Sequence, residues 1–302
     1  MSALPVLQNY SSKPSSEPAQ FSHRVVAENR RLASDVLWVR FSADQNSGLQ
    51  NFTPALVDEF HTVLDSIRRP AGTVTALPLG GGARYTVIQS THPDYFSVGG
   101  DLRFFRSCIA AGDDARLRQY SISCLDLMHG LSTRLKGENT SISLVQGRAL
   151  GGGFEMALST DYLIAEERSS FGFPEIMFGL FPCTGAMGLL ANKVGARQAE
   201  KMMTNKRIYS ADELLQMGII DEVCSDGEGE QAVERYVAEH TRRQKALLKV
   251  QKSRYMTAPL DYDEGARVVE DWVETAMNLS TEEIRTMEML ILMQSRDAAP
   301  GH

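Results

Sequence analysis

The feature that most constrains the fold is a repeated change of hydrophobic period between neighbouring segments. Apolar residues cluster in short stretches at residues 35–41 (DVLWVRF), 85–90 (YTVIQS) and 141–147 (SISLVQG), as in buried strands. Between them, residues 53–69 and 102–136 carry apolar side chains at three- and four-residue spacing, as amphipathic helices do. Strands that alternate with helices form a largely parallel sheet with helices packed outside it. The sequence therefore predicts an α/β fold.

The second half of the chain is predicted to be mostly helical. One more strand is expected at residues 162–167 (YLIAEE). Beyond it the chain shows helical periodicity, and two of the helices have a recognisable first turn. The expected helices lie at residues 184–193, at 196–203, after a capping box of Ser210 and Glu213, and in a run of three from about residue 230, the last of which follows a capping box of Ser280 and Glu283.

Composition divides the chain into three parts. The opening residues are rich in Ser and Pro and lack hydrophobic periodicity, so residues 1–30 are predicted to form a loosely ordered N-terminal arm. Residues 31–229 hold the alternating strands and helices, and we expect them to form one core domain. Residues 230–302 are expected to form a C-terminal helical region.

Charge and cysteine content narrow the class of protein. The 302 residues include 31 Lys and Arg against 38 Asp and Glu, a formal charge of -7, which disfavours nucleic acid as a partner. Four cysteines lie far apart without C-x-x-C spacing, so we expect reduced thiols and a cytoplasmic location. No segment resembles a secretory signal or approaches the roughly 20 apolar residues of a membrane span.

Two glycine-rich loops each follow a predicted strand. Gly151, Gly152 and Gly153 lead into a helix, and the segment FSVGGDL contains Gly99 and Gly100. Glycine has no Cβ, so backbone N–H groups in such loops can approach a substrate atom closely. We therefore predict that the N–H groups of Gly100 and Gly152 form an oxyanion hole. The alternative is that these glycines only permit a tight turn between strand and helix.

Two carboxylates lie near these glycines. Glu155 is three positions after Gly152, about one turn into the predicted helix and on the same face as its opening. Glu175 follows Pro174 in a loop after the next strand, which returns the chain to the same end of the sheet. We predict that Glu155 and Glu175 form a general acid–base pair for chemistry next to a thioester. The alternatives are a carboxylate near a helix N-terminus and a solvated surface acid.

Other chemistries find less support in the sequence. The six histidines show no metal-ligand spacing, so no metal is predicted. There is no G-x-S-x-G motif for a serine hydrolase. Cys183 has no histidine near it in the sequence, which disfavours a thiol nucleophile.

Taken together, the motifs resemble those of the crotonase (enoyl-CoA hydratase/isomerase) superfamily. The resemblance implies the crotonase fold, in which repeated ββα units form a core sheet with surrounding helices, and a C-terminal helical region that mediates trimerisation. It also implies that Gly100 and Gly152 are the oxyanion-hole donors and that Glu155 and Glu175 are the acid–base pair. The matching segments are residues 96–102 (FSVGGDL), 147–155 (GRALGGGFE), 171–175 (FGFPE) and 196–223.

Within that superfamily, the chain is most similar to the diffusible signal factor (DSF) synthases of bacterial quorum sensing. The similarity lies in residues 77–105, the helical insert after them, and residues 147–167 and 171–187. It implies a bifunctional enzyme that dehydrates a 3-hydroxyacyl thioester of acyl carrier protein to a cis-2-enoyl thioester and hydrolyses it to the free cis-2-unsaturated fatty acid. No cofactor is implied, because the substrate is carried on the phosphopantetheine of the carrier protein, or on CoA. The alternatives are an enoyl-CoA hydratase or isomerase acting on acyl-CoA and, less favoured because both glutamates are present, a non-catalytic scaffold.

The same similarity implies several partners. Besides the acyl carrier protein, it implies a homotrimer or hexamer and, for some members of the family, a regulatory signalling protein. The stretch at residues 235–254 is strongly basic. It is either a solvated helix face or a surface that docks the acidic carrier protein or the phosphate of its phosphopantetheine arm.

The chain departs from ordinary hydratases at two places. Phe173 stands where they often have a polar residue before Pro-Glu, and residues 182–187 (PCTGAM) replace a glycine-rich P-G-x-G-G-T segment. Both changes predict a more apolar pocket suited to an acyl chain, or else a filled core.

Overall fold

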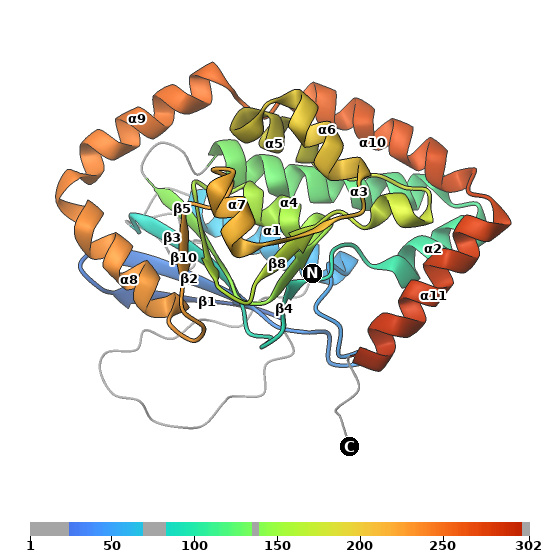
Figure 1. The fold of residues 1–302 in the computed structure, drawn as a ribbon, viewed down its shortest axis with the longest axis horizontal. Helices are drawn as coiled ribbons and strands as arrows, with labels where there is room; N and C mark the ends of the chain where they lie inside the picture. The colour runs from blue at the N-terminus through green and yellow to red at the C-terminus, as the bar shows by residue number, and fades with distance from the viewer. Residues whose placement is uncertain (1–23, 69–82, 135–138, 298–302) are drawn as a thin grey trace.

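Two β-sheets form the centre of the computed structural model, which describes residues 24–68, 83–134 and 139–297 (Figure 1). In the larger sheet, β1 pairs antiparallel with β2, and the other neighbouring strands run parallel. Its strands, in spatial order, are β1 (Val25–Arg31), β2 (Asp35–Phe41), β3 (Tyr85–Ser90), β5 (Thr140–Val145), β7 (Tyr162–Glu166) and β10 (Glu222–Cys224).

The smaller sheet is built from short strands that continue those of the larger one. β3, β5 and β7 are each followed along the chain by a strand of the smaller sheet and then by a helix, so the ββα unit repeats. β4, β6 and β8 run parallel, which places the loops that follow β4 and β6 side by side. The strands are β4 (Tyr95–Ser97), β6 (Arg148–Leu150), β8 (Ser170–Gly172) and β9 (Ile208–Ser210).

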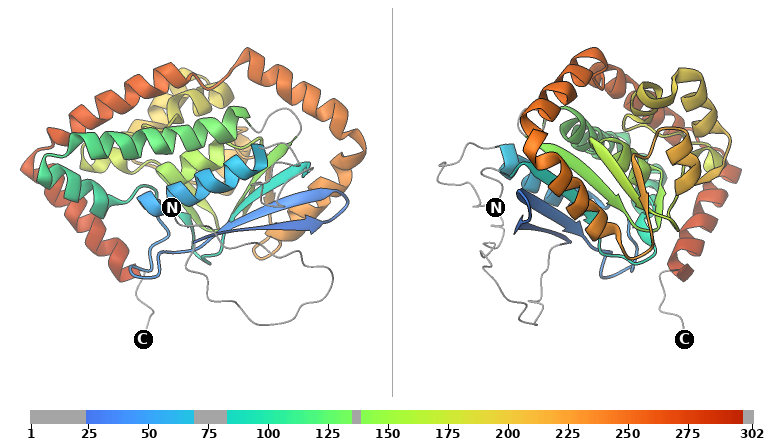
Figure 2. Two further views of the ribbon diagram at one scale, coloured as in Figure 1. Left: turned by 180° about the vertical axis from the view of Figure 1, so that it is seen from behind. Right: turned by 60° about the vertical axis from the view of Figure 1, so that its left-hand side comes forward.

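Helices cover both faces of the larger sheet (Figures 1 and 2). Side chains alternate between strand faces, so Leu37 and Val39 of β2 join the main core while Val36 and Trp38 join a second cluster under α8. None of the helices in the described ranges is long and apolar enough to cross a membrane. The α-helices are α1 (Pro54–Arg68), α2 (Leu102–Ala111), α3 (Asp114–His129), α4 (Gly152–Leu158), α5 (Ala186–Val194), α6 (Ala196–Thr204), α7 (Ala211–Gln216), α8 (Gly229–His240), α9 (Gln244–Thr257), α10 (Tyr262–Met277) and α11 (Thr281–Asp297), with short turns η1 (Gly130–Arg134), η2 (Glu175–Phe178) and η3 (Thr241–Arg243).

A row of side-chain hydrogen bonds crosses four parallel strands at their carboxyl ends. Arg40 of β2 donates from Nε to Gln89 Oε1 on β3 at 3.0 Å, and Gln89 donates from Nε2 to Gln146 Oε1 at 2.6 Å. Gln146, just after β5, donates from Nε2 to Glu166 Oε1 on β7 at 2.8 Å. Arg40 also donates to the carboxylate of Glu230 on α8 at 2.8 Å. Each side chain in the row therefore supplies a polar partner for the next.

The predicted α/β class and the repeated ββα units are confirmed. The helical stretch expected at residues 102–136 is divided at Gly112, which ends α2 in the left-handed conformation with φ 65°, and Asp113 then caps α3. Residues 135–136 lie outside the described residues. The capping box of Ser210 and Glu213 is present at the start of α7.

Three details of the expected organisation differ from the structure. Residues 25–30 of the expected N-terminal arm belong to β1, which pairs with β2 along its whole length, while residues 1–23 lie outside the described residues. After residue 228 the described chain forms four α-helices rather than three, because the short turn η3 separates α8 from α9. The helix expected from residue 184 begins at Ala186, because Gly185 is left-handed, with φ 111°.

The contact between α3 and α10 gives a test of core packing. A Cβ added at Gly265 of α10 would lie 2.8 Å from Cδ1 of Leu125, which is fully buried in α3. Gly265→Leu is therefore expected to lower the free energy of unfolding by about 1–3 kcal/mol, as overpacking usually does. Urea unfolding followed by circular dichroism measures this change. Asp271→Ala, at an exposed position of the same helix, is the control, and equal stability of the two variants would contradict a tight contact at Gly265.

Candidate active site

Two glycine loops, one after β4 and one after β6, meet with their backbones in contact. Gly99 has φ 93°, and a Cβ there would lie 2.9 Å from the carbonyl oxygen of Leu150 and 3.2 Å from the nitrogen of Gly152. A Cβ at Gly153 would lie 2.7 Å from both Cβ and the carbonyl oxygen of Ser97. Only glycine fits at these two positions without displacing backbone. The absence of side chains therefore allows the two loops to approach each other.

This approach places the amides of Gly100 and Gly152 close together. A Cβ at Gly152 would lie 3.8 Å from the nitrogen of Gly100, and both glycines line the same pocket. Gly152 opens α4, and the first amides of a helix have no acceptor within it. Within the described parts of the chain, neither N–H donates to a protein acceptor. Both predicted oxyanion-hole donors are thus brought together and left available.

Glu155 is held rigidly at the side of this pocket. Its side chain lies on α4, and the residue is only 2% exposed. Oε1 accepts hydrogen bonds from the backbone amides of Thr184 at 2.8 Å and Ala186 at 3.1 Å, and Oε2 accepts one from Thr184 Oγ1 at 2.5 Å. Burial raises the pKa of Glu155 above its ordinary value, and these three donors oppose that rise because they stabilise the carboxylate.

Glu175 lies in a different environment. It follows Pro174 at the start of η2, and a Cβ added at Gly151 would clash with its Oε1, so the carboxylate lies against the glycine loop. Its Oε2 is buried without a hydrogen-bond partner. Burial, and then the negative charge of Glu155, raise the pKa of Glu175 to about 8. At neutral pH Glu175 therefore carries a proton, whereas the donors around Glu155 favour its ionised form.

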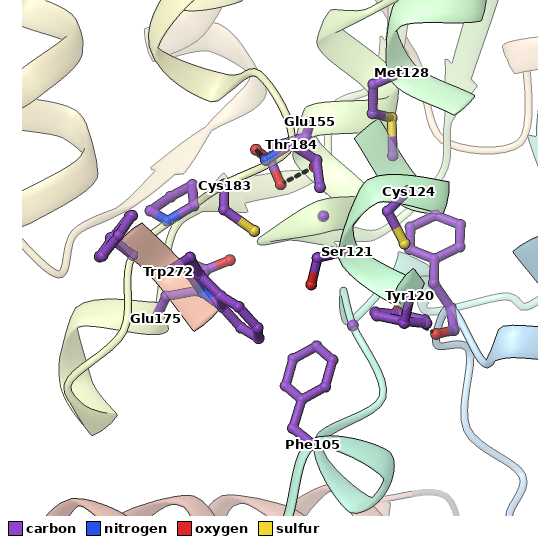
Figure 3. Close-up of a pocket in the computed structure, with 15 residues that line it drawn as sticks. Phe105, Tyr120, Ser121, Cys124, Met128, Glu155, Glu175, Cys183, Thr184 and Trp272 are labelled. Carbon is purple, nitrogen blue, oxygen red and sulfur yellow. Dashed lines mark hydrogen bonds between the residues drawn. The ribbon is translucent and has the colours of Figure 1, made fainter. Parts of the chain in front are cut away.

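Two neighbouring pockets share the amide of Gly100 and the carboxylate of Glu175. The first, which we call the Glu155 pocket, has an empty volume of about 460 Å³ (Figure 3). The second, the α11 pocket, has an empty volume of about 960 Å³ and includes Leu290 and Met293 of α11. The two pockets share Gly100, Phe105, Glu175 and Trp272. The amide of Gly100 and the carboxylate of Glu175 therefore lie at the boundary between the two pockets.

Comparison with known proteins identifies the family. The sequence profile of the enoyl-CoA hydratase/isomerase family matches residues 49–289. The chain belongs to this family. Across 98 residues, which are 32% of this chain and 35% of the relative, it is 37% identical to a mevalonyl-coenzyme A hydratase of Beauveria bassiana. Across 138 residues, which are 46% of this chain and 17% of the relative, it is 33% identical to the peroxisomal bifunctional enzyme of Homo sapiens.

Solved structures of the enoyl-CoA hydratase/isomerase family share the fold. The enoyl-CoA hydratase from Bacillus halodurans superposes with a TM-score of 0.68 at 23% identity, over 88% of this chain and 99% of that one. The curated relatives named above match this chain over about a third of their length or less. The comparisons therefore establish family and fold, while the substrate has to be argued from the site.

Several side chains that line the Glu155 pocket were not predicted from the sequence. Phe105 comes from α2, Tyr120 and Met128 come from α3, and Trp272 comes from α10. The ring centroids of Phe105 and Trp272 are 5.1 Å apart in an edge-to-face contact. The helical periodicity of these segments was visible in the sequence, but it does not tell which apolar side chains face a pocket rather than the core.

The two departures from ordinary hydratases have different outcomes. Phe173 does not line either pocket; it is buried and stacks on Phe154 with ring centroids 5.1 Å apart, so it fills the core. Cys183 and Thr184, from the 182–187 segment, do line the Glu155 pocket. Burial, and then the charge of Glu155, raise the pKa of the Cys183 thiol well above its ordinary value, which disfavours the thiolate needed for a nucleophile.

The basic stretch at residues 235–254 lies away from the pockets. Its later part forms α9, which is attached by buried glutamines: Gln244 donates to the carbonyl of Arg84 at 2.8 Å, and Gln251 accepts from Thr140 Oγ1 at 3.1 Å. These contacts lie beside the amino ends of β3 and β5. α9 and α11 lie at opposite ends of the molecule (Figures 1 and 2). Carrier docking on α9 next to the pocket of the same chain is therefore disfavoured.

The contrast between the two glutamates gives a direct test. NMR of protein labelled with 13C at the glutamate δ-carboxyl should show one carboxyl with a pKa of about 8, absent in Glu175→Gln. In Glu155→Gln this pKa should fall, because a negative charge next to Glu175 has been removed. Glu234→Gln, which changes an exposed carboxylate on α8, is the control and should leave the pKa unchanged. A Glu175 carboxyl that titrates near 4.5 in the wild-type protein would contradict the burial described above.

Proposed function

We propose that this protein catalyses the elimination or addition of water at the Cα–Cβ bond of an acyl thioester. One observation carries the proposal: the amides of Gly100 and Gly152 and the carboxylates of Glu155 and Glu175 converge on a single pocket. Such a reaction needs this set of groups, because negative charge develops on the thioester oxygen while protons move at the two neighbouring carbons.

In the elimination direction, the thioester oxygen accepts hydrogen bonds from Gly100 and Gly152. Glu175 takes the proton from Cα, and the electron pair of the C–H bond moves toward the carbonyl to give an enolate held by the two amides. The Cβ–O bond breaks as the Cα–Cβ double bond forms, and Glu155 protonates the departing hydroxyl, which leaves as water. Addition of water follows the same steps in reverse.

The two glutamates exchange roles in the two directions. Elimination starts with the proton on Glu155 and ends with the proton on Glu175, and addition starts and ends the other way round. In both directions the active pair therefore carries one proton. The pKa of about 8 at Glu175 and the donors that stabilise ionised Glu155 support a singly protonated pair at neutral pH, with the proton resting on Glu175. Addition of water starts from this state, whereas elimination starts after the proton has moved to Glu155.

For the substrate we propose a 3-hydroxyacyl group on acyl carrier protein, as the similarity to the DSF synthases implies. The thioester would lie at Gly100, which both pockets share. The acyl chain would extend into the Glu155 pocket, because Glu155 has to reach the oxygen on Cβ, and the pantetheine arm would occupy the α11 pocket. The cis geometry of the product and the preference for a carrier protein rest on the similarity alone.

We further propose that the same site hydrolyses the thioester. One of the glutamates would take a proton from water, whose oxygen attacks the thioester carbon. The oxyanion that forms would accept hydrogen bonds from Gly100 and Gly152, as the enolate does. The C–S bond then breaks, the sulfur leaves as a thiol after taking a proton from the glutamic acid, and the free cis-2-enoic acid remains.

A second candidate function is that of an enoyl-CoA hydratase or isomerase acting on a soluble CoA thioester. The family profile and the mevalonyl-CoA hydratase relative favour it. Two separate incubations, one with a 3-hydroxyacyl thioester of acyl carrier protein and one with trans-2-enoyl-CoA, each followed by mass spectrometry, separate the two functions. Release of free cis-2-enoic acid supports the signal synthase, and reversible hydration of trans-2-enoyl-CoA with an intact thioester supports the hydratase. Absence of both reactions contradicts the proposed elimination and addition of water.

We also propose that the protein assembles as a homotrimer or as a hexamer of two trimers. Met289, Leu292 and Met293 of α11 are each more than half exposed, which supports a subunit contact in the C-terminal region. Size-exclusion chromatography with light scattering is expected to give three or six times the chain mass of 33.4 kDa. A monomer over the working concentration range would contradict this. A regulatory signalling protein remains a prediction from the similarity.

The oxyanion hole can be tested without disturbing the fold. Outside its chain neighbours and the backbone of α4, a methyl group at Gly152 would have Cδ2 of Phe52 as its nearest atom, at 3.6 Å, and it would lie 3.8 Å from the nitrogen of Gly100, in the space proposed for the thioester oxygen. Gly152→Ala should therefore keep the wild-type melting temperature and lose about 100-fold or more in kcat, as loss of oxyanion donors does. Full activity of a normally folded Gly152→Ala would contradict the proposed hole.

A further inference from the structure

Both carboxylate oxygens of Glu155 are already engaged by one short segment. The amides of Thr184 and Ala186 donate to Oε1 at 2.8 and 3.1 Å, and the hydroxyl of Thr184 donates to Oε2 at 2.5 Å. Thr184 is 5% exposed, so its hydroxyl is shielded from bulk water. A short hydrogen bond between a hydroxyl and a carboxylate in such surroundings favours the charged form strongly.

Of these three donors, only the hydroxyl depends on the identity of a side chain. The two amides are supplied by the backbone, whose path is set by left-handed Gly185 with φ 111°, so most residues at 184 would still provide the N–H. A hydroxyl in this place requires threonine or serine. The residue at 184 therefore controls how strongly Oε2 of Glu155 is stabilised, while the loop itself keeps Glu155 in position.

The other glutamate lacks a comparable partner. Glu175 Oε2 is buried without a hydrogen bond, although it belongs to the same pocket as Glu155. A proton shared by the two acids is therefore disfavoured on Glu155, where it would displace the Thr184 hydroxyl from Oε2 or the two amides from Oε1, and is tolerated on Glu175. The asymmetry between the two acids originates on the Glu155 side.

We propose that Thr184 is a positioning residue that determines which of the two glutamates carries their shared proton. Its hydroxyl keeps Glu155 ionised, and the proton consequently remains on Glu175. The contacts of Thr184 are seen directly in the structure, and only the kinetic consequence rests on the proposed function. Figure 3 shows the bond from Thr184 to Glu155, with Glu175 on another side of the same pocket.

The other titratable groups that face the pair do not compete for this proton at neutral pH. Burial raises the pKa of the Tyr120 phenol on α3 well above its ordinary value, and burial raises that of the Cys124 thiol, also on α3, to about 12. The Cys183 thiol, in the loop before α5, has a pKa raised by burial as well. These three groups remain neutral, so Glu155 and Glu175 alone exchange a proton over the range in which most enzymes work.

Replacement of Thr184 by valine tests the proposal. Thr184→Val keeps the branched shape but removes the hydroxyl, so Glu155 should bind a proton more readily and its pKa should rise by about 1 unit or more. Thr184→Ser restores a hydroxyl and should stay close to the wild-type value. Thr86→Val is the matched control. Like Thr184, Thr86 is buried, but it lies in β3 and lines neither pocket. Its hydroxyl has no hydrogen-bond partner in the described structure.

Two measurements read the result. The first is NMR titration of 13C-carboxyl-labelled glutamate, in which Glu155 is assigned from Glu155→Gln; it needs no substrate. The second is the pH profile of kcat/KM, whose acid limb reports the step from the doubly to the singly protonated pair and should move to higher pH in Thr184→Val. A merely structural role would lower activity without moving the limb.

The outcomes are distinguishable. An upward shift of the Glu155 pKa in Thr184→Val, absent in Thr184→Ser and Thr86→Val, supports the proposal even if no thioester is turned over. If the Glu155 pKa rises in the NMR titration but the acid limb of the kcat/KM profile does not move, the role of Thr184 is upheld and the proposed acid–base role of Glu155 is contradicted. An unchanged Glu155 pKa in a folded Thr184→Val overturns the proposal. Should Thr184→Val not fold, Thr184→Ala is judged by the same titration.

Discussion

The contact between the backbones of Gly99 and the Leu150–Gly152 turn is the constraint on which the rest of the site depends. A side chain at Gly99 or at Gly153 would meet backbone atoms of the facing segment, so neither position tolerates a Cβ. The parallel pairing of β4 with β6 brings the loops together, and glycine allows them to touch. The two amides, the start of α4 and the place of Glu155 all follow from this approach. The ββα repeat thus places the backbone amides of the loops after β4 and β6 side by side in a largely apolar pocket.

That surrounding explains why the two acids differ. A pocket walled by aromatic and thiol side chains cannot hold two unpaired negative charges close together, since each would lose its hydration. The molecule satisfies one carboxylate with donors and leaves the other with an unpartnered oxygen. Burial that would destabilise an ordinary core acid here leaves one group able to give a proton and the other able to accept one.

The chemical groups of the site could be predicted from the sequence, whereas its walls could not. Gly100, Gly152, Glu155 and Glu175 stand in short local patterns, and the strands around them return the chain to one end of the sheet, so their convergence follows from the α/β fold. Trp272 reaches the pocket from α10, far along the chain, and only three-dimensional packing shows this. The strands of the smaller sheet have three residues each, too few for any periodicity to appear. η3 separates α8 from α9 without a glycine or proline to mark the break.

The row of side chains from Arg40 to Glu166 has a consequence for how the sheet assembles. β3 and β5 are buried at every position, so they lack the alternation of exposed and buried residues that ordinarily prevents neighbouring strands from sliding past one another. Arg40 on β2 is paired in register with Gln89 on β3. The hydrogen bonds from Gln89 to Gln146 and from Gln146 to Glu166 likewise require one particular register between β3, β5 and β7. A slip by one residue would leave these polar groups stranded in an apolar interior. The row of hydrogen bonds therefore favours one alignment of these strands over its neighbours.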